Sequence, residues 1–220
     1  MRVPGLGIRV IPACLCLLAF GAAADAACQP PSGRLDYNVL NDGSSIGWLR
    51  MDFRGDGIRT EIHTTIDVRV NFFFLIPILV YRHDSKEVWV NGEFRRYSGV
   101  TVDNGREHVV TVDAGGRALR VVKNGLAEEV EAAMLSRAVW CQETLQYGRL
   151  LSPLKGRLKE IVAEYLGEEW IEVGGRPLLT RHYAVTEDGR QGAVWYGEDG
   201  IVVKARFPTK HGTQMTLLLD

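Results

Sequence analysis

The sequence predicts a mainly β fold, a strongly curved antiparallel sheet with one or two short helices. Turn dipeptides recur along the chain, and their residue types tolerate the positive φ angles of tight hairpin turns. These dipeptides are Asp42-Gly43, Asp56-Gly57, Asn91-Gly92, Asn104-Gly105, Gly115-Gly116, Asn124-Gly125, Gly174-Gly175, Asp188-Gly189 and Asp199-Gly200. The segments between them are short and rich in Val, Ile, Thr and aromatic residues, which is typical of an antiparallel meander.

The first 26 residues have the pattern of a secretory signal peptide. Arg2 and Arg9 give a positive start, residues 11–20 are almost wholly apolar, and Ala24-Asp25-Ala26 offers small residues to a signal peptidase. The apolar run is shorter than the ~20 residues that a membrane-spanning helix needs. We therefore expect this leader to be removed, residues 27–220 to form a single β domain, and the product to lie in the periplasm or to be secreted.

Two cysteines, Cys28 and Cys141, remain after the leader is removed. An even pair in an oxidising compartment predicts a disulfide, with two separate buried thiols as the alternative. Lipid modification at Cys28 stays open as well, although Asp25 stands where a lipobox has Leu. No metal site is expected, because two distant cysteines without nearby histidines make a poor ligand set.

The charge balance argues against a nucleic-acid-binding protein. The chain has 26 basic and 27 acidic residues, and loss of Arg2, Arg9 and Asp25 with the leader leaves 24 and 26. A nucleic-acid-binding domain would carry a basic stripe instead.

The clearest strand is predicted over residues 58–74. Apolar residues and Thr occupy one parity, and charged or polar residues occupy the other up to Asn71. Alternation of this length places one face on an apolar interior and one in water. A strand this long is expected to bend or to carry a bulge. Further strands are expected around residues 35–39, 49–53, 109–112, 170–173, 178–185, 193–196, 201–207 and 213–219.

Two stretches are less clearly strands. Leu126 to Trp140 has Ala, Glu and Met at positions that favour a short helix. Residues 157–166 fit a helix closed by Gly167, and they also fit an alternating strand. The alternatives for this second segment stay open on periodicity alone.

No enzyme signature is found. The chain has no GxSxG nucleophile elbow, no HExxH zinc motif and no GxGxxG or P-loop, so neither a cofactor nor catalysis is expected.

The densest polar and aromatic cluster is the segment 81–89. On a strand, Tyr81, His83, Ser85, Glu87 and Trp89 share one face. This face either lines a cleft or belongs to an edge strand with aromatic cross-strand pairs, and the second interpretation is favoured. The preceding run, Phe72 to Val80, is apolar on both parities and predicts either ordinary core or a membrane-facing or ligand-facing surface.

The order of several landmarks resembles a family of uncharacterised exported bacterial proteins that is known only as a domain of unknown function. The resemblance covers residues 34–219. The landmarks are Tyr81, Glu87, Trp89, Asn91-Gly92, Asp103-Asn104-Gly105, Trp140, Leu151-Ser152-Pro153, Gly156, Gly167-Glu168-Glu169, Gly174-Gly175, Tyr183, Trp195-Tyr196 and Gly200.

The family resembles in fold the lipoprotein carriers LolA and LolB and the small enzyme VioE. The resemblance implies an unclosed barrel with a lid over an apolar cavity, and a strand over residues 157–165. Cys28, Cys141 and the bulky run 72–80 depart from the pattern, which leaves open whether the cavity is open, filled or bridged shut.

These observations predict an exported protein that binds or carries an apolar small molecule or lipid. The candidate ligand-binding residues are Tyr81, His83, Glu87, Trp89, Phe72, Phe74, Trp140 and Trp195. An assembly or interaction factor of the cell envelope, in peripheral contact with the membrane, is the second hypothesis. A cofactor-independent enzyme that uses Glu87, His83 or Tyr81 is the third. The oligomeric state is left open.

Overall fold

The computed structural model describes residues 30–72, 76–116, 118–131, 134–135, 140–209 and 212–220. The described elements of the first half are β1 (Gly33–Asn41), β2 (Ser44–Gly55), β3 (Arg59–Phe72), β4 (Ile76–Val90), β5 (Glu93–Asp103), β6 (Arg106–Gly115), β7 (Ala118–Lys123) and β8 (Leu126–Glu131). Those of the second half are β9 (Met134–Leu135), the short 3₁₀ helix η1 (Gln142–Gln146), β10 (Arg149–Ser152), β11 (Arg157–Val173), β12 (Arg176–Glu187), β13 (Arg190–Tyr196), β14 (Val202–Pro208) and β15 (Gln214–Leu219).

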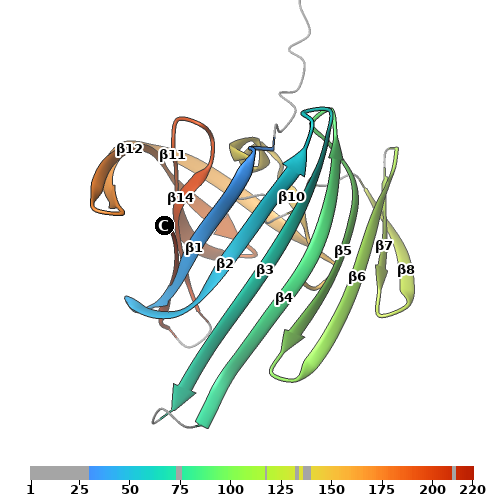
Figure 1. Ribbon diagram of the computed structural model, residues 1–220, viewed down its shortest axis with the longest axis horizontal. Helices are drawn as coiled ribbons and strands as arrows, with labels where there is room; N and C mark the ends of the chain where they lie inside the picture. Colours follow the sequence, from blue (N-terminus) through green and yellow to red (C-terminus); the bar gives the residue numbers. More distant parts are fainter. Residues whose placement is uncertain (1–29, 73–75, 117, 132–133, 136–139, 210–211) are drawn as a thin grey trace, which may run out of the picture.

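The strands form one sheet in the order β8-β7-β6-β5-β4-β3-β2-β1-β15-β14-β13-β12-β11-β10-β9. Each pair is antiparallel except β9 and β10, which run parallel. Pairing of β1 with β15 joins the two halves of the chain in the middle of the sheet. The predicted class, a mainly β fold with a curved antiparallel sheet and few helical residues, is confirmed (Figure 1).

The two ends of the sheet come close together. β8 and β9 follow each other in the chain but lie at opposite ends of the strand order. Three peptide links join Glu131 to Met134, so these residues are at most about 11 Å apart. Glu131 Oε2 also lies 4.0 Å from Arg149 Nη1 on β10. The sheet therefore curls into a barrel-like shape that is not closed.

The predicted turns fix the hairpins. In five Asx-Gly dipeptides both residues have positive φ, as a type I′ turn requires: Asp42-Gly43, Asn91-Gly92, Asn104-Gly105, Asn124-Gly125 and Asp188-Gly189. At Asp56-Gly57, Gly115-Gly116 and Asp199-Gly200 only the second residue has positive φ, so these turns are of another type.

The long alternating segment is a strand with one buried face. β3 begins at Arg59, one residue later than predicted. Its buried side chains lie on the predicted parity: Thr60, Ile62, Thr64, Ile66 and Val68. The expected irregularity occurs in its pairing with β4, where the register shifts between Val70 and Asn71.

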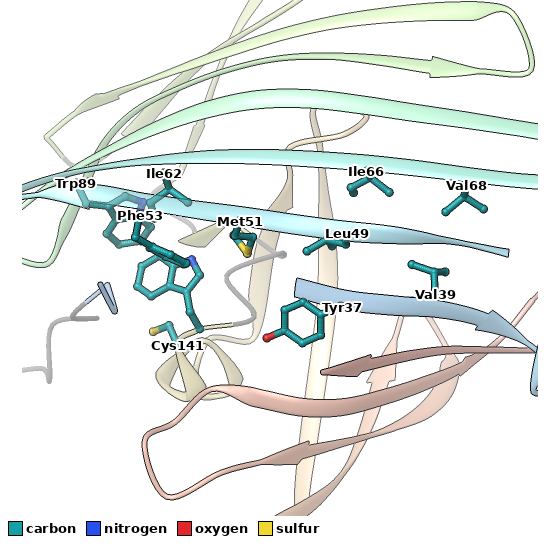
Figure 2. Packing of buried hydrophobic residues seen from close by; sticks show 11 residues of the cluster. Tyr37, Val39, Leu49, Met51, Phe53, Ile62, Ile66, Val68, Trp89 and Cys141 are labelled. Carbon is teal, nitrogen blue, oxygen red and sulfur yellow. The ribbon is translucent and has the colours of Figure 1, made fainter. Parts of the chain in front are cut away.

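Buried apolar side chains gather in three clusters on one face of the sheet, which we call the inner face. The largest cluster comprises Tyr37, Val39, Leu49, Met51, Phe53, Ile62, Ile66, Val68, Trp89, Trp140 and Cys141 (Figure 2). A second cluster lies on β5–β7 together with Leu151 of β10, and a third lies on β10–β14. The Tyr37 hydroxyl donates a hydrogen bond of 2.9 Å to the carbonyl of Val202, which links the first and third clusters.

The prediction of a short helix over Leu126–Trp140 is wrong for the described part of that range. Residues 126–131 form β8, paired with β7. The type I′ turn at Asn124-Gly125 sends the chain straight back along β7, and pairing with that strand overrides a weak helix propensity. Residues 157–173 form β11, as the family resemblance implied. Within the part of the chain that the structure describes, the short helix is η1.

Candidate functional site

The polar segment of β4 lies on the inner face, not at an edge of the sheet. β4 is paired with β3 on one side and β5 on the other, so the edge-strand interpretation is wrong. His83, Glu87 and Trp89 are buried and Tyr81 is half-buried. The shared parity predicted for these residues therefore brings them to the interior.

His83 is held by hydroxyl groups on both sides of its ring. Its Nδ1 lies 2.8 Å from Thr101 Oγ1, and its Nε2 lies 2.9 Å from Ser85 Oγ and 3.5 Å from the Tyr97 hydroxyl. The rings of His83 and Tyr97 are stacked, with centroids 6.5 Å apart. Such a network satisfies polar groups that would otherwise be costly to bury.

A glycine makes this network sterically feasible. Gly99 pairs with Ser85, and a Cβ at Gly99 would collide with the hydroxyl of Tyr97. The absence of a side chain at Gly99 lets the Tyr97 ring fold back toward His83.

Glu87 is a carboxyl group in an apolar environment. Its Oε2 accepts a hydrogen bond of 3.0 Å from Trp89 Nε1. Burial raises the pKa of Glu87 from 4.5 to about 7, and the donated indole N–H opposes the shift only in part. Near neutral pH this carboxyl is therefore partly protonated.

Trp89 and Trp140 come together at one end of the site. Their rings meet edge to face, with centroids 4.8 Å apart. Trp140 also contacts Phe53 edge to face at 6.1 Å, and Figure 2 shows Phe53 beside Trp89. Two of the predicted ligand-binding tryptophans thus form part of the core.

A turn between β10 and β11 covers the site. Pro153 and Leu154 are buried and line a cavity together with Leu49, Met51, Thr64, Ile66, His83, Ser85, Glu87 and Tyr97. The volume of this cavity is about 10 Å³, which is close to the room that one water molecule needs. The inner face at this point is therefore filled mainly by the covering turn.

The covering turn is held by a few contacts. Lys155 Nζ lies 3.5 Å from Asp103 Oδ2 on β5, in a partly exposed ion pair. Gly156 has a φ of +54°, and a Cβ there would touch Val110 and Val121. The turn therefore packs directly on β6 and β7.

Trp195 is not part of this site. On β13 it lies between Val194 and Tyr196, which belong to an inner-face cluster, so it points to the opposite face. There its ring stacks on His182 with centroids 4.4 Å apart, and its Nε1 donates a hydrogen bond of 2.8 Å to Glu169.

Three of the candidate residues are only partly described or not described at all. Phe74 and Cys28 lie outside the described residues, and of Phe72 only the backbone, paired with Ile76, is described. Cys141 is buried, and its Sγ lies 3.2 Å from Glu143 Oε2. The Cys28–Cys141 disulfide stays a prediction.

Sequence reasoning missed several residues of the site. Thr64, Tyr97, Thr101 and Leu154 are small, or resemble ordinary core residues, and they come from strands and a turn far apart in sequence. The signal that could have found them is cross-strand register, which places Thr64 opposite Ser85 and Thr101 opposite His83.

Comparison with known proteins identifies the family and the type of fold. A crystal structure of a β-barrel-like protein of domain of unknown function DUF1849 from Brucella abortus is similar to this chain, with a TM-score of 0.62 and 11% identity. The match covers 85% of this chain and 94% of the other, and at this low identity it supports the fold alone.

No curated protein matches the chain. No helix among the described residues is long and apolar enough to cross a membrane. The model of the family described as domain of unknown function DUF6134 matches residues 37–220, and the chain therefore belongs to this family.

Proposed function

We propose that this protein is exported to the periplasm or secreted, and that it binds an apolar ligand such as a lipid on the inner face of its sheet. The observation that carries the proposal is the extensive apolar inner face, which carries a group of buried polar side chains on β3–β5 at the place where one turn covers it. Apolar pockets with a few placed polar groups are the usual form of a small-molecule site. The leader pattern of residues 1–26 supports export.

The proposed ligand takes the place of the covering turn. Leu154 inserts an apolar side chain into the space beside Met51 and Ile66, where part of an acyl chain would fit. The Lys155–Asp103 ion pair is partly exposed, and exposed pairs of this kind contribute only about 0–1 kcal/mol. This ion pair therefore adds little to the cost of lifting the turn, and the apolar chain of the ligand would replace the burial that Pro153 and Leu154 lose.

Shortening Leu154 tests this role. Leu154→Ala opens space under the turn, so we expect the neutral fluorescent probe N-phenylnaphthylamine to bind more tightly to this variant than to the wild type. Leu126→Ala is the matched control, because Leu126 is 79% exposed on β8. The wild type purified from native envelopes should carry lipid detectable by native mass spectrometry. If no lipid co-purifies and neither the wild type nor Leu154→Ala binds the probe, the proposed function is wrong.

We also propose that the β3–β4 hairpin brings the protein to the envelope membrane. Pairing of β2 with β3 stops at Val68 and pairing of β5 with β4 stops at Tyr81, whereas β3 and β4 pair onward to Phe72 and Ile76. This two-stranded projection lies at the lower end of β3 and β4 in Figure 1, and its β4 strand begins with the apolar residues Ile76–Val80. Ile78 on it is 58% exposed, and exposed Arg69, which is paired with Val80, offers a positive charge to anionic lipid.

Co-sedimentation with vesicles tests the membrane contact. Ile78→Asp should reduce binding to vesicles of phosphatidylglycerol and phosphatidylethanolamine, because a charge at the apolar surface resists insertion. Ile58→Asp is the control, since Ile58 is 63% exposed at the opposite end of β3. If Ile78→Asp and Ile58→Asp bind the vesicles equally well, the β3–β4 hairpin is not the membrane contact.

A further inference from the structure

The cavity under the covering turn contains a hydroxyl group without a hydrogen-bond partner. Thr64 is 7% exposed, lines the cavity, and its Oγ1 has no partner among the described residues. Buried hydroxyl groups are nearly always hydrogen-bonded in native proteins. The orphan hydroxyl of Thr64 therefore marks a place where a further polar atom fits.

The neighbouring polar groups limit what that atom can be. His83 uses both ring nitrogens on Thr101 and Ser85. Glu87 accepts one hydrogen bond, from Trp89, and a carboxyl group has capacity for more. Thr64 lies opposite Ser85, and Glu87 is two residues from Ser85 on the same face of β4. An atom in the cavity can therefore reach both Thr64 and Glu87.

The charges around the cavity disfavour an anion. None of the residues that line it is Lys or Arg. The nearest cation of the covering turn, Lys155, is paired with Asp103. The ionisable groups that face Glu87 are His83 on its own strand and Tyr97 on β5, whereas β3 presents Ile62 and Thr64. At a pH above the pKa of Glu87, an ionised carboxylate or phosphate would therefore meet a second negative charge without a compensating positive one.

We infer that the site selects an apolar ligand that ends in an uncharged hydroxyl group, such as a long-chain alcohol or a neutral lipid with a free hydroxyl. A hydroxyl group can donate a hydrogen bond to Glu87 and accept one from Thr64 at the same time. A carboxylate cannot donate a hydrogen bond to an ionised Glu87. An ammonium could donate to both Glu87 and the Thr64 hydroxyl, but it would carry a full charge into an apolar cavity at a large desolvation cost. This inference rests on the proposed function, because it assumes that the apolar part of the ligand replaces Pro153 and Leu154.

Binding of three ligands with the same chain tests the inference. Dodecanol, dodecanoate and dodecylammonium are titrated into the mature chain and into Leu154→Ala at about pH 8.5, where Glu87 is ionised. Binding is followed by the intrinsic tryptophan fluorescence, to which Trp89 and Trp140 beside the site contribute. We expect dodecanol to bind at least about tenfold more tightly than the other two, the factor that corresponds to one satisfied hydrogen bond.

Two variants test whether the preference for dodecanol arises from the polar groups of the cavity. Thr64→Val keeps the shape of the side chain and removes the hydroxyl, so it should weaken dodecanol about tenfold. Thr60→Val is the matched control, because Thr60 is buried on the same face of β3 but does not line the cavity. Glu87→Gln removes the negative charge that opposes an anion, so it should tighten dodecanoate binding and narrow the preference for dodecanol over dodecanoate.

The outcomes separate the inference from the proposed function. If dodecanoate or dodecylammonium binds as tightly as dodecanol, or if Thr64→Val behaves as Thr60→Val does, the head-group inference is wrong and apolar binding stands. If none of the three ligands binds either protein, both the inference and the proposed function are wrong.

Discussion

The Glu87 carboxyl is the residue at which burial has the clearest energetic consequence. Its pKa is about 7 in the folded chain, against 4.5 ordinarily, because it is removed from water. The folded state therefore holds a proton that the unfolded state has lost between these two pH values. Stability from this group is fully present below about pH 4.5 and is lost as the pH rises through about 7.

We expect the free energy of unfolding to fall between pH 5 and pH 8 by up to about 3 kcal/mol on account of Glu87. Glu87→Gln does not titrate and should lack this part of the slope. Urea denaturation of both proteins across this range measures the difference, in which the contributions of other groups cancel. Parallel slopes in the two proteins would contradict the assignment.

At the scale of elements, the turns do more than reverse the chain. The side chains of Asp42, Asn104, Asn124 and Asp188 each accept a hydrogen bond from a backbone N–H of a strand beside the hairpin. For example, Asn104 Oδ1 accepts a hydrogen bond of 2.9 Å from the backbone N–H of Val80 on β4. For Asn91 the structure gives only the backbone bond to Ile58. The backbones of these residues adopt the positive φ angle that the turn needs. Their side chains add one hydrogen bond to the strand beside the hairpin.

This difference predicts unequal effects of the same substitution. Glycine keeps the turn conformation but loses the side-chain acceptor, so Asn104→Gly should lower the free energy of unfolding by about 1 kcal/mol more than Asn91→Gly does. Thermal or urea denaturation of the two variants provides the measurement. Equal losses would mean that the amide of Asn104 contributes nothing beyond its backbone conformation.

The elements of the fold could largely be predicted, but the partners within the site could not. Asn91-Gly92 correctly marks the β4–β5 hairpin, and alternation correctly places His83 and Glu87 on one face. A regular ladder from that turn would set Glu87 opposite Arg96. A bulge between Val88 and Trp89 shifts the register by one residue and brings Tyr97 there instead. Bulges depend on the twist and curvature of the whole sheet, which single-strand patterns do not record.

The covering turn and the helix prediction fail for related reasons. Leu154 reaches the inner face of β2–β5 because the sheet is strongly curved. The residues that it meets there are far away in sequence, so no local pattern around Leu154 indicates the contact. Residues 126–131 become a strand because β7 offers them a ladder, although their composition favours a helix. In both cases tertiary contacts outweigh local preference.

At the scale of the whole molecule, the predicted disulfide would tie the N-terminal segment to the core. Cys141 belongs to the largest inner-face cluster, next to Trp140. A bond from Cys28 to Cys141 would close a long loop and contribute about 2–5 kcal/mol. We expect Cys28→Ser and Cys141→Ser to lose similar stability under oxidising conditions, whereas reductant should erase the effect of Cys28→Ser. Non-reducing peptide mapping identifies the bond directly, and free thiols at both positions would contradict the prediction.

The pairing of β1 with β15 places the first and last strands side by side at the centre of the sheet, with the Asp220 amide 3.0 Å from the carbonyl oxygen of Asp36. A short linker could therefore fuse the natural termini, and the chain could be reopened at the seam between Glu131 and Met134. In such a circular permutant every hydrogen-bonded strand pair would join neighbours along the chain. In the natural order β1 pairs with a strand almost two hundred residues away in sequence. In the permutant the paired strands would all be neighbours in sequence, which lowers the contact order, so it should fold faster.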